Sequence, residues 1–190
     1  MVKVIASNIR KGQVIEHEDG QLYVVLKAET FRPGKGTPTT TIDMRRIADG
    51  VKTVITTKTT DGLERAFVEE VDHSFSYLDG DDYIFMNAEN YEQMIVPAAM
   101  LGDDAQWLQD GATCKILMFD GKPITIQVPS RVTMAITATE PVVKGQTASS
   151  SYKPATVESG ARVMVPPHIE VGTRIVINTE DGAYVERAKD

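Results

Sequence analysis

The stretch that decides the fold is a hairpin in which two β-type runs flank a turn rich in glycine and proline. The sequence reads Leu22-Tyr23-Val24-Val25-Leu26, then Phe31-Arg32-Pro33-Gly34-Lys35-Gly36-Thr37-Pro38, then Thr41-Ile42-Asp43-Met44-Arg45-Arg46-Ile47. Glycine admits backbone angles that other residues avoid, and proline cannot continue a sheet ladder. The runs are therefore predicted to be strands, joined by a tip that carries Lys35 outward. Geometry alone leaves two readings of this lysine equally open, a solubilising side chain or a functional one.

Short strand-like runs continue on both sides of this hairpin, separated by turns that contain glycine. Asp-Gly pairs mark several of these turns, among them Asp49-Gly50, Asp79-Gly80, Asp120-Gly121 and Asp181-Gly182, and such pairs are typical of β-hairpins. Capping residues predict two short helices, at 87–94 and 103–108. This spacing predicts an all-β fold of small barrels of the oligonucleotide-binding (OB) kind. The expected domains are residues 1–65, 66–128 and 129–190.

Charge is distributed unevenly along the 190 residues, whose net charge is −7. Residues 1–65 hold 11 Lys and Arg against 8 Asp and Glu, a balance of +3. Residues 66–128 hold 2 against 12, a balance of −10, and residues 129–190 hold 7 of each. A phosphate-bearing partner would thus meet the first third and be repelled by the second. An acidic surface that only keeps the protein in solution is an equal alternative for the middle third.

The residues that usually carry catalysis or bind metals form no convincing constellation. His17, His73 and His168 lie far apart, and none has a companion at metal-ligand spacing. Cys114 is the only cysteine, which excludes an internal disulfide and favours a reducing compartment. No apolar run reaches the roughly 20 residues of a membrane helix, and the first residues do not resemble a secretory signal. We therefore expect a cytoplasmic protein that is not an enzyme, with no metal, no cofactor and no membrane partner.

Basic residues are spread along the first third in a pattern that suits RNA. They are Lys27, Arg32, Lys35, Arg45, Arg46, Lys52 and Lys58. A basic stripe on a barrel can follow a phosphate backbone, which makes Arg45 and Arg46 candidate RNA-contacting residues. A merely solvated face is the alternative reading.

Six short motifs, in order along nearly the whole chain, resemble the bacterial elongation factor P family. They are Pro33-Gly34-Lys35-Gly36, Met44-Arg45-Arg46, Phe85-Met86-Asn87 with Tyr91-Glu92-Gln93, Gly121-Lys122-Pro123-Ile124, Lys153-Pro154-Ala155-Thr156, and Gly182-Ala183-Tyr184-Val185-Glu186-Arg187. The resemblance implies an N-terminal KOW-like (SH3-like) barrel followed by two OB barrels. It also implies an L-shaped arrangement similar to transfer RNA, for which an acidic middle segment offers a mimic of a polyanion.

The resemblance further implies a translation elongation factor that binds the 70S ribosome between the peptidyl (P) and exit (E) sites. Such factors promote peptide-bond formation at consecutive prolines by positioning the acceptor end of the peptidyl-tRNA. The tip that contacts the tRNA would be Lys35 with Arg32, Pro33, Gly34 and Gly36. In many family members this lysine carries a β-lysyl-type modification, attached by a ligase similar to lysyl-tRNA synthetase.

A loop in the third domain of this family is implicated in contacting messenger RNA in the exit site. It normally reads Gly-Asp-Thr-Ala before a glycine-rich stretch, whereas this chain has Gly145-Gln146-Thr147-Ala148 followed by serines. These four residues are the candidate mRNA-contacting loop. Two other classes of function compete with a ribosomal factor. A general RNA-binding protein is disfavoured by the acidic middle, and an enzyme is disfavoured by the lack of a nucleophile, base pair or metal set.

Overall fold

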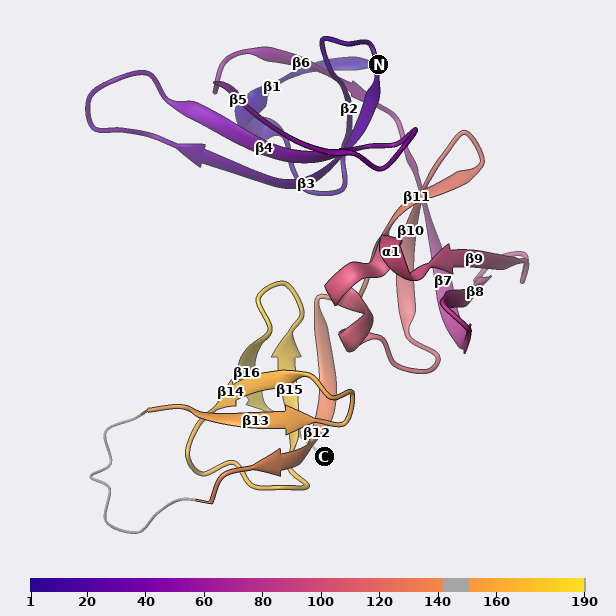
Figure 1. Cartoon of the computed structure of the whole chain (residues 1–190), viewed down its shortest axis with the longest axis vertical. Helices are drawn as coiled ribbons and strands as arrows, with labels where there is room; N and C mark the ends of the chain where they lie inside the picture. Colours follow the sequence, from indigo (N-terminus) through magenta and orange to yellow (C-terminus); the bar gives the residue numbers. More distant parts are fainter. Residues whose placement is uncertain (142–150, 190) are drawn as a thin grey trace. The chain divides into compact units, whose positions relative to one another are not determined.

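The computed structural model describes residues 1–141 and 151–189, which form three β-sheets with little helix (Figure 1). The first sheet uses strands from the N-terminal third, the second uses strands from the middle, and the third uses strands from the C-terminal third. The all-β fold predicted from the sequence is confirmed.

The first sheet has the strand order β1-β6-β2-β3-β4-β5. Its elements are β1 (Val2–Ile5), the 3-10 helix η1 (Ala6–Asn8), β2 (Val14–Glu16), β3 (Leu22–Phe31), β4 (Thr39–Arg46), β5 (Lys52–Lys58) and β6 (Gly62–Ala66). Alternate residues of β4, namely Thr40, Ile42 and Met44, are buried, because successive side chains of a strand point to opposite faces. The core beneath it contains Ile9, Ile15, Tyr23, Val25, Ile42 and Met44.

The second sheet has the order β11-β10-β7-β8-β9. Its elements are β7 (Glu69–Asp79), β8 (Asp82–Asn87), β9 (Gln93–Pro97), β10 (Thr113–Phe119) and β11 (Lys122–Gln127), with the short helices α1 (Ala98–Leu101) and η2 (Gly102–Trp107) before β10. The turn between β10 and β11 has positive φ at both central residues, Asp120 (51°) and Gly121 (73°). Asp-Gly pairs favour this turn because both residues tolerate positive φ, so the predicted hairpin is confirmed.

One of the two predicted helices is wrong. Residues 88–90 form a turn after β8, and β9 begins at Gln93. The Asn87 side chain does accept backbone hydrogen bonds, from the N–H groups of Glu89 (2.8 Å) and Asn90 (3.2 Å), but it closes a turn instead of starting a helix. Tyr91, at φ 61°, then reverses the chain into β9. The helix predicted at 103–108 is confirmed by η2 (Gly102–Trp107), although η2 is a 3-10 helix and not an α-helix.

The third sheet has the order β14-β13-β12-β15-β16. Its strands are β12 (Arg131–Thr139), β13 (Lys153–Val157), β14 (Arg162–Val165), β15 (Arg174–Asn178) and β16 (Ala183–Arg187). Its core includes Trp107, which comes from η2 and is 4% exposed. Gly182, at φ 68°, faces this ring, since a Cβ at this position would lie 3.4 Å from Trp107 Cζ2. The close approach and the positive φ together explain a glycine in the β15–β16 turn.

By its internal contacts the chain divides into two compact units. One contains residues Met1–Asp72 and Lys115–Gln127, and the other contains His73–Cys114 and Val128–Asp190. In the first unit, Leu117 and Ile124 of the β10–β11 hairpin pack against Val14, Val24 and Ala66 of the first sheet. The predicted division into residues 1–65, 66–128 and 129–190 stays a prediction.

Within the part of the chain that the structure describes, no helix is both long enough and apolar enough to cross a membrane. The longest helical element among the described residues is η2, a 3-10 helix.

Candidate functional site

The predicted functional lysine lies in the loop of residues 32–38, between β3 and β4. The strands end at Phe31 and Thr39, which pair directly across the hairpin. Residues 34–37 are all exposed. A Cβ on Gly34 would meet no atom within 4 Å, and Gly36 has φ +119°, a conformation that favours glycine. Lys35 therefore stands between two small residues, with free space beside it for a ligand.

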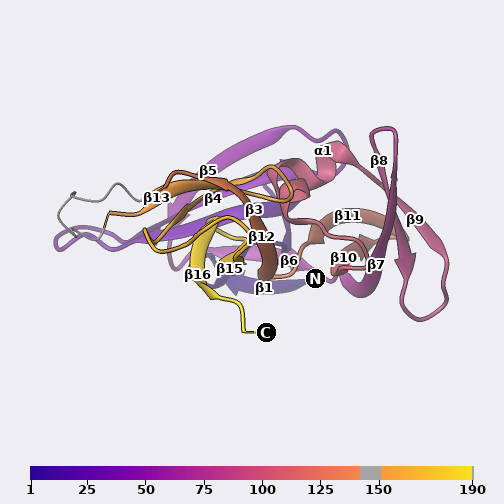
Figure 2. The same ribbon diagram turned by 90° about the horizontal axis from the view of Figure 1, so that it is seen from below.

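The outer half of the hairpin extends beyond the core that supports its inner half. In β3, Tyr23, Val24 and Val25 are buried, whereas residues 29–31 are exposed. Figures 1 and 2 both show β3 and β4 running side by side, with their loop reaching past the rest of the first sheet. The ladder β3-β4-β5 continues to the end of the hairpin, where Thr39 pairs with Lys58. Hydrogen bonds between strands, and not an apolar core, thus hold the loop in place.

The loop carries positive charge that no acidic side chain of residues 1–141 and 151–189 neutralises. Among the described residues, neither Arg32 nor Lys35 forms an ion pair. The nearest acidic residue along β3, Glu29, is bonded to Lys27 at 2.8 Å. Two cations on an exposed loop attract phosphate oxygens and can donate hydrogen bonds to them.

Arg46, a candidate RNA-contacting residue, is held by contacts within the first sheet. Its Nε donates to the Tyr23 hydroxyl (3.1 Å) and its Nη1 donates to Asp49 Oδ2 (2.9 Å). Its guanidinium also lies over the Tyr23 ring, 5.6 Å from the centroid, and Tyr23 donates to Asp19 Oδ2 at 2.8 Å. The Tyr23 hydroxyl is the first cause of a raised pKa for Arg46. The side chain is therefore a structural cation that closes the base of the hairpin.

Arg45, its neighbour, is also engaged. Its Nη2 donates to the backbone carbonyl of Ile124 (3.2 Å) in the β10–β11 hairpin. Sequence reasoning could not find this bond because the two residues are far apart along the chain. An RNA contact by either arginine stays a prediction. It would have to use the guanidinium N–H groups that do not take part in these bonds.

The Asp19–Tyr23–Arg46 network predicts a pH-dependent stability. The pKa of Asp19 is lowered from 3.8, first by the backbone N–H of Gln21 and then by the Tyr23 hydroxyl. A lowered folded-state pKa contributes stability that is present above the unfolded-state value and is lost as the pH falls through the folded value. We expect Asp19→Asn to lower the urea midpoint at about pH 7 and to lower it less at about pH 3. A difference that stays constant between these pH values would contradict this assignment.

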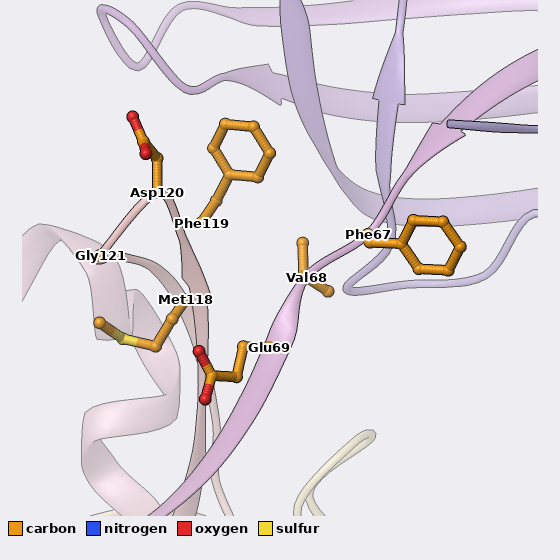
Figure 3. Close-up of a pocket in the computed structure, with 7 residues that line it drawn as sticks. All are labelled: Phe67, Val68, Glu69, Met118, Phe119, Asp120 and Gly121. Atoms are coloured by element: carbon orange, nitrogen blue, oxygen red, sulfur yellow. The ribbon is translucent and has the colours of Figure 1, made fainter.

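A groove elsewhere in the first unit is lined by few side chains that could take part in catalysis. It encloses about 610 Å³ and is lined by Phe67, Val68, Glu69, Met118, Phe119, Asp120 and Gly121. In Figure 3 the Phe67 ring points away from the other labelled side chains, and the Glu69 carboxylate lies beside the strand that carries Met118. The only ionisable side chains along it are two carboxylates, with no histidine, lysine or thiol to act with them. Across residues 1–141 and 151–189, no group of three or more His, Cys, Asp or Glu is arranged to hold a metal ion.

The candidate mRNA-contacting loop, Gly145, Gln146, Thr147 and Ala148, lies outside the described residues. Nearby, Lys153 begins β13 and donates from Nζ to the carbonyl of Glu140 at 2.8 Å. The role of this loop stays a prediction.

Three models of the elongation factor P family match the chain in consecutive segments. The KOW-like domain matches residues 5–63, the OB domain matches residues 68–126, and the C-terminal domain matches residues 132–187. The order and the domain types are those that the resemblance implied.

Relatives of known name match over the full length. The chain is 62% identical to elongation factor P of Hyphomonas neptunium and 58% identical to that of Methylobacterium nodulans, with all of both chains covered in each case. It is 57% identical to elongation factor P of Rhizobium leguminosarum bv. trifolii, again over both chains completely. The protein belongs to the elongation factor P family and is a translation elongation factor.

Proposed function

We propose that this protein binds the ribosome between the peptidyl and exit sites and promotes peptide-bond formation at consecutive prolines. The observation that supports this most directly is the exposed loop with Lys35 at its centre, where Lys35 has no acidic partner among the described residues. The Lys35 ammonium would donate hydrogen bonds to phosphate or ribose oxygens at the acceptor end of the peptidyl-tRNA.

The physical basis is positioning. Proline reacts poorly because its ring fixes φ and its nitrogen is secondary. A factor that holds the acceptor end in the reactive arrangement lowers the entropic part of the barrier without supplying a reacting group. Lys35 would thus be a positioning residue, and the ribosome would perform the chemistry.

A covalent extension of Lys35 fits the same task. We propose a β-lysyl-type group, attached by a ligase similar to lysyl-tRNA synthetase, which would lengthen the reach of the side chain and add a second amine. The open space beside Gly34 leaves room for such a group and for the enzyme that attaches it. The intact mass of the natively expressed protein tests the proposal, since an unmodified mass would contradict it.

The test of the main proposal is synthesis of a reporter with a run of prolines in a translation system depleted of this factor. Addition of the natively expressed protein should restore the full-length product, while a matched reporter without the prolines should be made equally well with and without it. If the protein gives no relief at the prolines, the proposal fails.

A further inference from the structure

Three side chains of different chemistry stand side by side at the base of the Lys35 loop. Phe31 of β3 pairs directly with Thr39 of β4, which pairs directly with Lys58 of β5. Directly paired residues of an antiparallel ladder project from the same face. The next residue of β4, Thr40, is buried on the opposite face, so this row faces outward. We call these three residues the outer row.

Within the described residues, no hydrogen bond or ion pair holds the side chains of the outer row. The Phe31 side chain is 69% exposed. In the part of the chain that the structure describes, neither the Thr39 hydroxyl nor the Lys58 ammonium makes a hydrogen bond or an ion pair.

The neighbouring rows of the ladder behave differently. On the inner face, Thr30 Oγ1 lies 3.0 Å from Thr40 Oγ1. On the outer face one step further along, Thr41 Oγ1 lies 3.1 Å from Thr56 Oγ1. In these two rows the threonine hydroxyls are bonded to each other, whereas the hydroxyl of Thr39, beside the loop, has no such bond among the described residues.

The charge around the outer row is positive. Arg32 follows Phe31 directly, and Lys58 lies at the other end of the row. The acidic residues nearby are already engaged. Glu29 is bonded to Lys27, and Asp61, which lies within electrostatic range of the Lys58 ammonium, accepts from the Thr57 hydroxyl and the Lys58 backbone N–H. An exposed aromatic ring between two cations suits a nucleotide, whose base stacks on a ring and whose phosphate seeks a cation.

We propose that the outer row is a platform for one nucleotide of single-stranded RNA. The base stacks on Phe31, the Thr39 hydroxyl bonds the ribose, and Lys58 and Arg32 contact the flanking phosphates. Phe31 and Lys58 lie two strand spacings apart, about 9–10 Å, which the flexible lysine stem and one nucleotide can span. The platform rests on the proposed function, because it would hold the RNA end that Lys35 meets. Stacking tolerates any base, so the platform would not restrict which tRNA is held.

Substitutions at Phe31 separate stacking from an apolar contact. In the proline-reporter system we expect Phe31→Trp to work at the wild-type concentration, and Phe31→Leu to need about tenfold more protein for half-maximal relief. The control is Val54→Ala, which removes an apolar side chain that is 61% exposed on the same sheet, and it should behave as wild type. If leucine works as well as phenylalanine while alanine fails, the residue serves an apolar protein contact and the RNA platform is wrong. Equal activity of the wild type, Phe31→Trp, Phe31→Leu and Phe31→Ala would also overturn it.

The salt dependence tests Lys58 independently. Lys58→Gln should reduce the slope of log apparent affinity against log salt by about 0.7, the share of one phosphate contact on a single strand. Phe31→Leu should leave this slope unchanged. If the salt dependence of Lys58→Gln equals that of the wild type, Lys58 does not contact a phosphate and this part of the proposal is wrong.

A measurement without the ribosome separates this proposal from the proposed function. Amide NMR signals of the full-length protein are followed while a short single-stranded RNA ending in CCA is added. Shifts at Phe31, Thr39 and Lys58 that disappear in Phe31→Leu support the platform, even if the protein gives no relief at prolines. Relief at prolines without shifts at the outer row would leave the function standing and overturn the platform.

Discussion

Replacement of Lys35 by alanine should remove most of the relief of stalling at consecutive prolines. The side chain lies on an exposed loop and forms no ion pair among the described residues, so its loss should leave the fold intact. What is lost is a charge-assisted hydrogen bond to the tRNA end, together with any group attached to the amine. Loss of one such bond corresponds to about a ten- to hundredfold fall in the rate at the proline run. The measurement is the rate of full-length reporter synthesis at saturating factor.

Two comparisons make this result specific. Lys11→Ala removes the same charge from another exposed position of the first unit and should behave as wild type. Lys35→Arg keeps the charge but is not a substrate for a lysine-modifying ligase, so it should lie between wild type and alanine if both charge and modification contribute. If Lys35→Ala matches the wild type while the wild type relieves stalling, then the loop is not the acting element, although the protein remains a factor for proline runs.

The fold could be predicted from the sequence wherever local chemistry decides it. The Asp120-Gly121 hairpin and the β3–β4 hairpin follow from turn residues and alternating side chains, and both are found. The helix expected at 87–94 failed because an asparagine followed by polar residues suits either a helix cap or a closed turn. In the structure Tyr91 adopts positive φ, which is incompatible with a helix that continues to residue 94. No sequence pattern predicts positive φ at a tyrosine.

The site was predictable to a similar degree. The exposure of Lys35 follows from the glycines and prolines around it, and the structure has it exposed. The internal bonds of Arg45 and Arg46 were missed because their partners are brought close only by the fold. The outer row was missed for a different reason: a row depends on register, and the bulge at Val25–Lys27 shifts the register of β3 against β4.

Replacement of Trp107 by alanine should be the most damaging single change to stability in the second unit. The ring is 4% exposed and lies in the core of the third sheet with Val132, Met134 and Ile175. Truncation of a buried tryptophan costs about 3–5 kcal/mol, because apolar contact is lost and a cavity is left. Urea unfolding followed by circular dichroism should show this loss, while Val171→Ala, at a side chain that is 60% exposed, should change stability by less than about 0.5 kcal/mol.

The location of the damage is the sharper test, because Trp107 belongs by sequence to the segment before the third sheet. If η2 is part of the core of the third sheet, amide hydrogen exchange in Trp107→Ala should accelerate in β12 and β15 and stay slow in β3 and β4, which lie in the other unit. Gly182→Ala should accelerate exchange in the same strands, because the alanine would have to adopt positive φ and its Cβ would press against the Trp107 ring. Faster exchange confined to β7–β9, with β12 and β15 unaffected, would show that Trp107 stabilises only the segment from which it comes.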